Sequence, residues 1–215
     1  YHANRGGIRF RKALQKVKNE TKGFIPDANY TQSVLEHSKQ INDIEKYLIN
    51  VGEFYPHKDN KVKFFPNGES FYPDIVEKIK NAKKFIFLEF FIIQIDESWA
   101  ILLELLEEKV KEGVEVRVLY DAMGSIMVSS KSYLSSLHKK GIQAKIFLKL
   151  IPLFSTKLNS RDHRKIAIID GEVAYTGGLN IANEYFNIGE NRFSYWKDIA
   201  VRIEGPAIRT FTTLF

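Results

Sequence analysis

Strand-like and helix-like segments alternate in the middle of the chain, and this alternation constrains the fold more than any other feature. Strands are predicted over 85–93, 114–120 and 142–148, and helices are predicted over 98–112 and 131–140. The first strand is apolar on both faces apart from Glu89, which is typical of a central, buried strand. Ser98 is the predicted N-cap of the first helix, and Gly113 and Gly141 stand just past the two helix ends. The pattern predicts an α/β fold with a partly parallel sheet.

Further elements are predicted on both sides of this segment. Before it lie a helix over 31–50, a strand over 61–65 and a helix over 70–84. After it lie strands over 164–170, 173–176 and 196–203, a short helix over 181–186 and a helix that opens at Gly205-Pro206. Asp170-Gly171 is a strong two-residue hairpin signal between the first two of these strands. The last helix is still apolar where the sequence stops, so the native protein is expected to continue.

The positive charge of the chain is concentrated at its beginning. The net charge is +6, and residues 1–22 contain seven of the 32 Lys and Arg residues but one of the 26 Asp and Glu residues. The rest of the chain is therefore neutral overall. A basic leader of this kind indicates an anionic surface nearby, either membrane or nucleic acid, although a solvated tail has the same charge pattern.

The composition excludes several kinds of protein and of site. The chain has no cysteine, so disulfides, thiolate catalysis and Cys-based zinc or iron–sulfur sites are excluded. The hydrophobic fraction of 44% and the charged fraction of 27% are those of an ordinary globular protein, not of a low-complexity chain. The longest apolar stretch, 85–93, is too short to cross a bilayer as a helix.

Residues that suit phosphate chemistry gather in the last third of the chain. Residues two apart on a strand share a face, so His163 and Lys165 are predicted to point the same way. Imidazole is a competent nucleophile toward phosphorus, and an adjacent ammonium can hold non-bridging phosphate oxygens. Gly177 and Gly178 allow close backbone approach, and the Asn180 amide can donate to the same phosphate.

The pattern His163-x-Lys165-x4-Asp170, followed by Gly177-Gly178-x-Asn180, resembles the signature of the phospholipase D superfamily (HxKxxxxD, then GG/GSxN). The surrounding segments resemble bacterial cardiolipin synthases in particular, and the resemblance covers about residues 60–215. It implies a phospholipase D-like sandwich lobe over 60–215, with a mixed β-sheet flanked by helices. Residues 1–59 are then a basic juxtamembrane arm and helical lead-in.

The resemblance also implies how the central residues act. His163 would attack the phosphodiester phosphorus and form a covalent phosphohistidine, while Lys165 and Asn180 would hold the phosphoryl oxygens. Asp170 completes the catalytic motif, but strand parity turns it away from His163. We therefore expect Asp170 to brace the hairpin instead of contacting substrate.

An acidic side chain should orient the imidazole of the nucleophile. Asp198 is the first candidate by motif match and Glu184 is the second, while an ordinary strand-end acid is the alternative interpretation of Asp198. No metal and no cofactor are expected, because lysines supply the positive charge that the phosphate needs.

The family builds each active site from two such motifs, and this sequence contains one. The chain is therefore expected to pair with a second lobe of the same polypeptide or with a copy of itself. The predicted function is transfer of a phosphatidyl group between two phosphatidylglycerol molecules, with release of glycerol, at the bacterial cell membrane and with the catalytic lobe in the cytoplasm.

Two other functions are alternatives to this one. The first is a phospholipase D-type phosphodiesterase or nuclease that acts as a single-motif homodimer; the neutral body of the chain makes nucleic acid an unfavoured partner. The second is a non-catalytic lobe that binds a membrane or a partner. The intact set of His163, Lys165 and Asn180 argues against it.

Overall fold

The computed structural model describes residues 12, 15–16, 19–20, 39–52, 55–148, 161–189 and 194–215. Most of the basic leader and the first part of the helix predicted over 31–50 lie outside these residues. That helix is described from Lys39 to Tyr47 (α2), and it continues as a π-helical turn, Leu48–Gly52. Within the described residues, no helix is long and apolar enough to cross a membrane.

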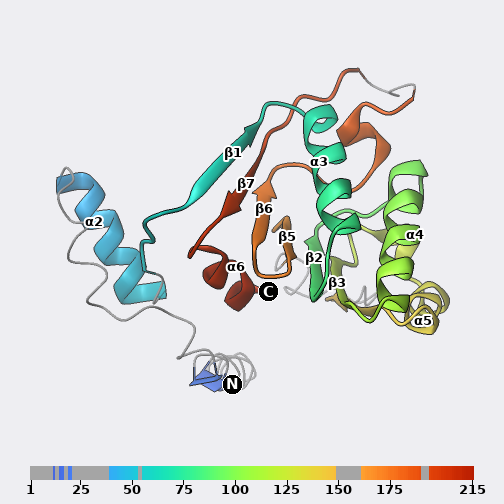
Figure 1. Ribbon diagram of the computed structural model, residues 1–215, viewed down its shortest axis with the longest axis horizontal. Coiled ribbons are helices and arrows are strands. Elements are labelled where there is room, and N and C mark those ends of the chain that lie inside the picture. The colour runs from blue at the N-terminus through green and yellow to red at the C-terminus, as the bar shows by residue number, and fades with distance from the viewer. Residues whose placement is uncertain are drawn as a thin grey trace, which may run out of the picture.

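A seven-stranded sheet forms the centre of the fold, in the order β1-β7-β6-β5-β2-β3-β4 (Figure 1). The strands are β1 (Lys61–Phe65), β2 (Phe85–Phe90), β3 (Glu115–Asp121), β4 (Gln143–Phe147), β5 (Ile166–Ile169), β6 (Val173–Gly177) and β7 (Ala200–Glu204). β2, β3 and β4 run parallel, and all other neighbours pair antiparallel. The predicted α/β fold with a mixed sheet is confirmed.

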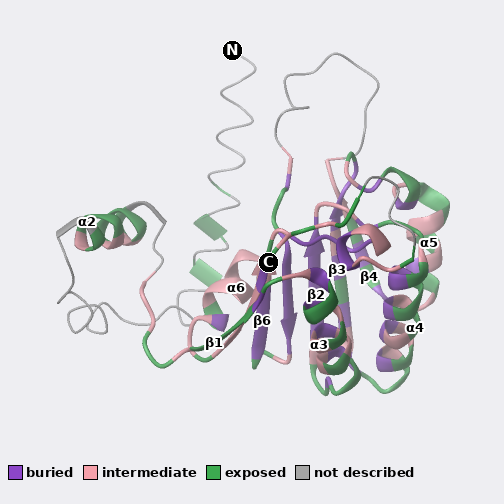
Figure 2. Cartoon of the chain, turned by 90° about the horizontal axis from the view of Figure 1, so that it is seen from above, coloured by how far each residue is buried: buried purple, intermediate pink, exposed green. Residues whose placement is uncertain are grey.

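Helices cover both faces of this sheet. They are α3 (Gly68–Lys80), α4 (Glu97–Lys111), α5 (Lys131–Lys139) and α6 (Ile208–Leu214), with short 3-10 turns at Ile126–Val128 and Asn183–Phe186. α3, α4 and α5 share the main core with the sheet, whereas α6 packs through Ile208 on a smaller apolar cluster that includes Phe87 and Ile168. The central strands are buried and the edge strand β1 is largely exposed (Figure 2).

The start of α4 differs from the prediction in its capping residue. Asp96, not Ser98, is the N-cap, and its carboxylate accepts hydrogen bonds from Trp99 N at 3.1 Å and from Ser98 Oγ at 2.7 Å. The other carboxylate oxygen accepts from Asn183 N at 2.7 Å. A carboxylate with two oxygens can serve all three donors, which a serine hydroxyl cannot do.

The topology brings four chain segments to one edge of the sheet, here the edge formed by strand ends and not by an outermost strand. β2 and β6 end there, while β5 and β7, which run the opposite way, begin there. The residues next to these strand ends carry the motif: 161–165 before β5, 178–180 after β6 and 198–199 before β7. The opposite edge holds the turn between β5 and β6 with Asp170.

Candidate functional site

The segment 161–165, which we call the motif segment, has no regular secondary structure and lies outside the sheet, because β5 begins at Ile166 and not at Arg164 as predicted. Its side chains nevertheless alternate between two sides. His163 and Lys165 lie against Phe91, while Asp162 and Arg164 contact each other and Arg164 contacts Glu89. The predicted separation of His163 and Lys165 from Arg164 is thus visible in the contacts, although no strand imposes it.

The side chains of His163 and Lys165, the two groups expected to act on phosphate, both pack against the ring of Phe91. The rings of Phe91 and His163 have centroids 4.8 Å apart, and Lys165 Nζ lies 5.4 Å from the centre of the Phe91 ring. Lys165 Nζ also donates to the main-chain oxygen of His163 at 2.7 Å. The imidazole is exposed, whereas Lys165 is 5% exposed.

The burial of Lys165 changes its acid strength. Burial lowers the pKa of Lys165, and the nearby charges of Asp198 and then Asp162 oppose this without cancelling it. An ammonium that is already stripped of much of its water interacts strongly with an entering phosphate oxygen.

Asn180 lies beside this pair and is held firmly. Its side chain is 4% exposed, and Oδ1 accepts a hydrogen bond from Ile92 N at 3.0 Å. A further hydrogen bond joins Asn180 to Tyr185, whose pKa is raised by burial. The amide group has two N–H donors, and within the described residues Tyr185 is their only partner, so the second N–H can donate to a ligand.

Two glycines let other groups approach the end of β6. A β-carbon at Gly177 would lie 2.4 Å from Ile199 O, and one at Gly178 would lie 2.1 Å from Asp198 Oδ1. Both distances are far below van der Waals contact. Gly177 requires glycine because it faces the main chain of Ile199, whereas a β-carbon at Gly178 would force the Asp198 side chain to shift. The Asp198 carboxylate therefore packs directly on the main chain of the Gly177-Gly178 segment.

The two candidate orienting carboxylates take different positions. Asp198 Oδ1 accepts from Ile199 N at 2.8 Å, and its charge acts on Lys165. Glu184 lies in the 3-10 turn Asn183–Phe186. Within the described residues, neither carboxylate is hydrogen-bonded to His163, so the assignment of an orienting acid stays a prediction.

Asp170 lies at the opposite edge of the sheet from His163. Its carboxylate accepts three main-chain hydrogen bonds, from Lys83 N at 2.7 Å, Lys84 N at 2.6 Å and Phe85 N at 2.9 Å. Its own φ is 58°, in the left-handed region. These bonds tie the β5–β6 turn to the start of β2, which is a structural role.

An acidic cluster of Glu89, Asp162 and Arg164, which the sequence pattern did not predict, supports the motif segment. Arg164 donates to Asp162 through Nε at 3.0 Å and Nη2 at 3.1 Å, and through Nη1 to Leu214 O at 3.0 Å. Nη2 also lies 2.7 Å from Glu89 Oε1. The one signal in the sequence was Glu89 itself, a single acid within an apolar strand.

The loop after β3 is bonded to the same region. Ser125 Oγ donates to Phe91 O at 3.0 Å and accepts from Ile93 N at 2.9 Å. Asp121 is fully buried; it accepts from Met123 N at 2.7 Å and, through Oδ2, from Asp162 N at 3.3 Å. The motif segment, the end of β2 and this loop therefore form one connected unit.

The groups at this edge suit an anion. The Lys165 ammonium, the second Asn180 N–H and the exposed imidazole of His163 can all donate to a phosphate, and the neutral imidazole can also attack it. In the ranges that the structure describes, no group of three or more His, Asp and Glu residues is arranged to hold a metal ion.

Comparison with known proteins decides the family. Residues 75–211, more than half of the chain, match the family model described as "Cardiolipin synthase, PLD-like domain". The chain belongs to this family. The resemblance drawn from the motif, to the phospholipase D superfamily and to cardiolipin synthases within it, is thereby confirmed.

Two relatives match nearly all of the chain. An uncharacterised protein of Streptococcus mutans is 43% identical over 211 residues, which is 96% of this chain and 45% of the relative. A cardiolipin synthase of Staphylococcus aureus is 33% identical over 205 residues, which is 95% of this chain and 41% of the relative. The chain thus spans less than half the length of either protein.

Solved structures share the phospholipase D-like fold at low sequence identity. Phosphatidylserine synthase of Haemophilus influenzae has a TM-score of 0.54 and 20% identity, over 71% of this chain and 35% of its own. NucT of Helicobacter pylori has a TM-score of 0.53 and 15% identity, over 73% of this chain and 92% of its own. At these identities the likeness concerns the fold alone.

Proposed function

We propose that this chain supplies half of the active site of a cardiolipin synthase-type phosphatidyltransferase. The reaction moves a phosphatidyl group from one phosphatidylglycerol to another and releases glycerol. The observation that carries the proposal is the meeting of His163 and Lys165 on Phe91, beside Asn180, in a chain of this family. The name of the S. aureus relative supports the choice of lipid.

The reaction proceeds in two displacements at phosphorus. His163 attacks the phosphorus of the first phosphatidylglycerol, a P–N bond forms, and the P–O bond to glycerol breaks. Glycerol leaves with a proton from a general acid, which the second motif supplies. The hydroxyl of a second phosphatidylglycerol then attacks phosphorus and loses its proton, the P–N bond breaks, and cardiolipin and free His163 result. Lys165 and Asn180 hold the non-bridging oxygens in both steps.

The second half of the site is also a proposal. Residues 60–215 form one catalytic lobe, and residues 1–59 precede it as a basic juxtamembrane arm. The missing general acid comes from a second lobe of the same polypeptide or from a homodimer partner. The relatives, each more than twice as long as the matched region, favour the first arrangement.

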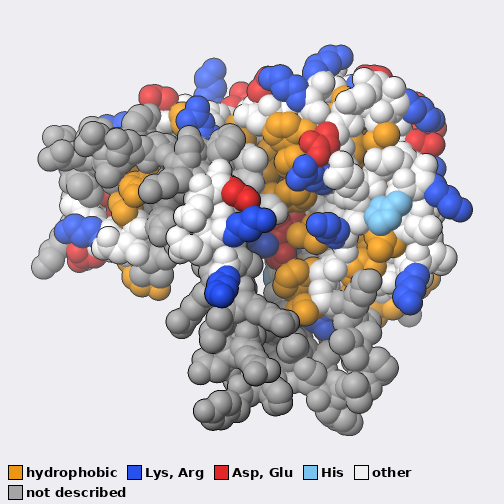
Figure 3. Space-filling view, turned by 90° about the horizontal axis from the view of Figure 1, so that it is seen from below, with side chains coloured by type: hydrophobic (Ala, Val, Ile, Leu, Met, Phe, Trp, Pro, Cys, Tyr) orange, Lys and Arg blue, Asp and Glu red, His pale blue; other side chains and the backbone are white. Residues whose placement is uncertain are grey.

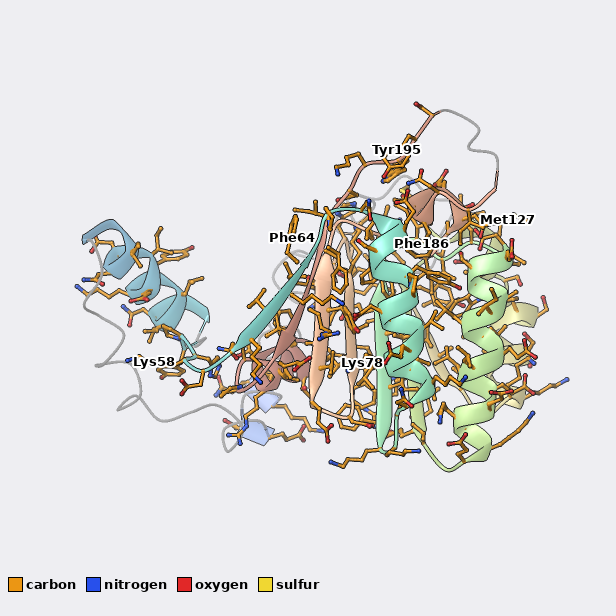
Figure 4. The ribbon with its side chains drawn as sticks, turned by 45° about the horizontal axis from the view of Figure 1, so that its top comes forward. Lys58, Phe64, Lys78, Met127, Phe186 and Tyr195 are labelled. Carbon is orange, nitrogen blue, oxygen red and sulfur yellow. The ribbon has the colours of Figure 1, made fainter. Side chains whose placement is uncertain are left out.

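An exposed apolar surface supports a lipid substrate. Four large apolar side chains on the loops after β2 and β3 are well exposed, and we call them the apolar rim: Ile95 (58%), Met123 (44%), Ile126 (64%) and Met127 (71%). These loops lie at the same sheet edge as the motif, and Figure 4 shows Met127 and Tyr195 at this end of the molecule. We propose that this edge faces the cytoplasmic surface of the bacterial cell membrane, with the basic leader beside anionic headgroups.

Removing the nucleophile tests the function. His163→Ala in the full-length protein should lower cardiolipin formation from phosphatidylglycerol vesicles by about 10³-fold or more, and should abolish the covalent phosphatidyl intermediate. His138→Ala is the matched control, because His138 lies on α5 and its ring is hydrogen-bonded to Ala144 O of β4, the outermost strand of the sheet on that side. Acid-quenched protein from labelled phosphatidylglycerol would reveal the intermediate; label trapped on another residue would refute the role of His163.

A phosphodiesterase or nuclease that acts as a single-motif homodimer is the second candidate, because this sequence contains one HxKxxxxD motif. The charge of the chain argues against a nucleic-acid substrate, since residues beyond the leader are neutral overall. On the face shown in Figure 3, Lys and Arg side chains are interspersed with acidic, apolar and neutral ones. Turnover of single-stranded DNA in place of phosphatidylglycerol would favour this candidate over the transferase.

A further inference from the structure

The acidic cluster behind the motif segment has an unusual member in Glu89. This side chain is 1% exposed and lies where β2 makes its last pair with β5, opposite Ile166. Although Arg164 is close, its directed hydrogen bonds go to Asp162 and to Leu214 O. Within the described residues, neither carboxyl oxygen of Glu89 accepts a well-directed hydrogen bond. A buried carboxylate without such donors is costly.

Glu89 and Asp162 share one guanidinium, that of Arg164, and the charge of Lys165 acts on Asp162 as well. A single guanidinium faces two carboxyl groups, and two carboxyls that share a buried site hold one proton between them. Asp162 accepts three hydrogen bonds from Arg164, through the main-chain N–H and the guanidinium, and is 8% exposed against 1% for Glu89. The proton therefore belongs to Glu89.

We propose that Glu89 is a positioning residue, whose carboxyl group carries a proton and donates a hydrogen bond to Asp162, thereby fixing the motif segment. Asp162 N in turn donates to Asp121, and Asp162 accepts from Arg164. The residues on both sides of His163 are thus anchored, and the imidazole is held over Phe91. This inference rests on the proposed role of His163.

The state of this proton depends on pH in a defined direction. Burial, followed by the hydrogen bond and the charge of Asp162, raises the pKa of Glu89 to about 8, while the charge of Arg164 opposes the rise. On the same face, Arg117 of β3 lies over Phe87 and pairs with Glu115, and α6 provides Arg164 with the Leu214 carbonyl. Above this pKa, Glu89 and Asp162 are both negative and repel each other, and the motif segment loses its support.

The test compares Glu89→Gln with the wild type in the full-length protein. The hydrolysis of bis(p-nitrophenyl) phosphate is followed, beside transfer in phosphatidylglycerol vesicles, from about pH 6 to about pH 9.5. If only the protonated form of Glu89 is competent, wild-type kcat falls about tenfold between about pH 7 and pH 9. A glutamine amide donates at every pH, so E89Q should lack this fall. Glu172→Gln, on an exposed residue paired with Lys84, is the control and should keep the wild-type profile.

A second variant separates positioning from packing. Glu89→Ala removes the donor, so kcat should fall at every pH with KM nearly unchanged, and E89Q should restore it. A thermal melt of each variant shows whether it is folded. The proposal is overturned if E89Q keeps the tenfold alkaline fall, or if folded E89A turns over as fast as wild type.

An infrared titration needs no turnover. Wild-type protein should show a protonated-carboxyl band that disappears near pH 8, and E89Q should lack it; absence of the band from wild type would refute the proposal. Failure of the proposed role of Glu89 can be distinguished from failure of the proposed transferase function. Hydrolysis of the model diester without transfer between lipids would reject the transferase while leaving the role of Glu89 open to the same comparison of pH profiles.

Discussion

At the scale of single residues, the candidate site depends on close approach of the main chain to a carboxylate. Gly178 and Asp198 are the clearest case, because a β-carbon at Gly178 would lie 2.1 Å from Asp198 Oδ1 and 2.4 Å from Oδ2. The charge of Asp198 also acts on Lys165. The glycine thus affects the electrostatics of the site as well as its shape.

Gly178→Ala should therefore force Asp198 out of place. We expect a loss of about 1–3 kcal/mol in the free energy of unfolding, as for overpacking elsewhere, together with a fall in turnover. Urea denaturation of the single variants and of Gly178→Ala/Asp198→Ala gives the coupling between the two positions. The double variant should recover stability relative to Gly178→Ala; strict additivity would contradict the clash.

The side-chain alternation around His163 could be predicted from the sequence, but its partners could not. The pattern predicts His163 and Lys165 on one side and Arg164 on the other, and the contacts follow this division. Phe91 and Glu89 reach the motif because β2 pairs with β5, far along the chain. A non-local pairing of this kind leaves no local pattern in the sequence.

At the scale of elements, a single cap connects α4 to the 3-10 turn after β6. Asp96 accepts hydrogen bonds from Trp99 N, Ser98 Oγ and Asn183 N, and Ser98 N donates back to Asn183 Oδ1 at 2.8 Å. Ser130, the cap of α5, accepts one hydrogen bond from a helix N–H, that of Tyr133. The two caps should therefore differ in their contribution to stability.

Asp96→Ala should lower the free energy of unfolding by about 2–3 kcal/mol, since a helix cap and a bond to a second element are lost together. Ser130→Ala is the control and should cost about 1 kcal/mol. Urea midpoints with unchanged slopes would report both values. Equal losses for the two variants would show that the bond to Asn183 contributes nothing.

Within the described residues, the predicted strands are present, but several of them begin or end at other residues because of strand pairing. The strand predicted over 164–170 is β5, Ile166–Ile169, because β2 pairs with it only up to Glu89. The strand predicted over 196–203 is β7, which starts at Ala200, where β6 and β1 begin to pair with it. These strands begin and end where their neighbours pair with them. The bounds of β1 agree with the prediction.

At the scale of the whole molecule, the strand order assembles the site. β7 lies between β1 and β6, so a segment from the end of the chain separates two earlier strands. The alternation of strands and helices predicts the parallel part, β2-β3-β4, because such units build parallel sheets. The pairing of β7 with β6 brings Asp198 to Gly178. This pairing is a tertiary contact that the local sequence pattern does not predict.

The apolar rim allows a test of membrane contact by the whole protein. Met127→Glu should weaken binding to phosphatidylglycerol vesicles by about tenfold, because a methionine no longer enters the apolar layer. Val62→Glu is the matched control, since Val62 is similarly exposed (64% against 71%) but lies on the edge strand β1. Vesicle sedimentation measures both, and equal weakening by the two variants would exclude a specific role for the rim.

The position of Asp170 has a consequence for the register of the motif. Lys165 stands just before β5 at one edge of the sheet, and Asp170 stands just after it at the other, bonded to the main chain of residues 83–85. The four residues between them are β5 itself, so the spacing between Lys165 and Asp170 in the motif equals the length of this strand. An insertion or deletion of one residue in β5 would invert its two faces or pull one end from its place. The motif is thus constrained by the length of β5 as well as by the chemistry of its side chains.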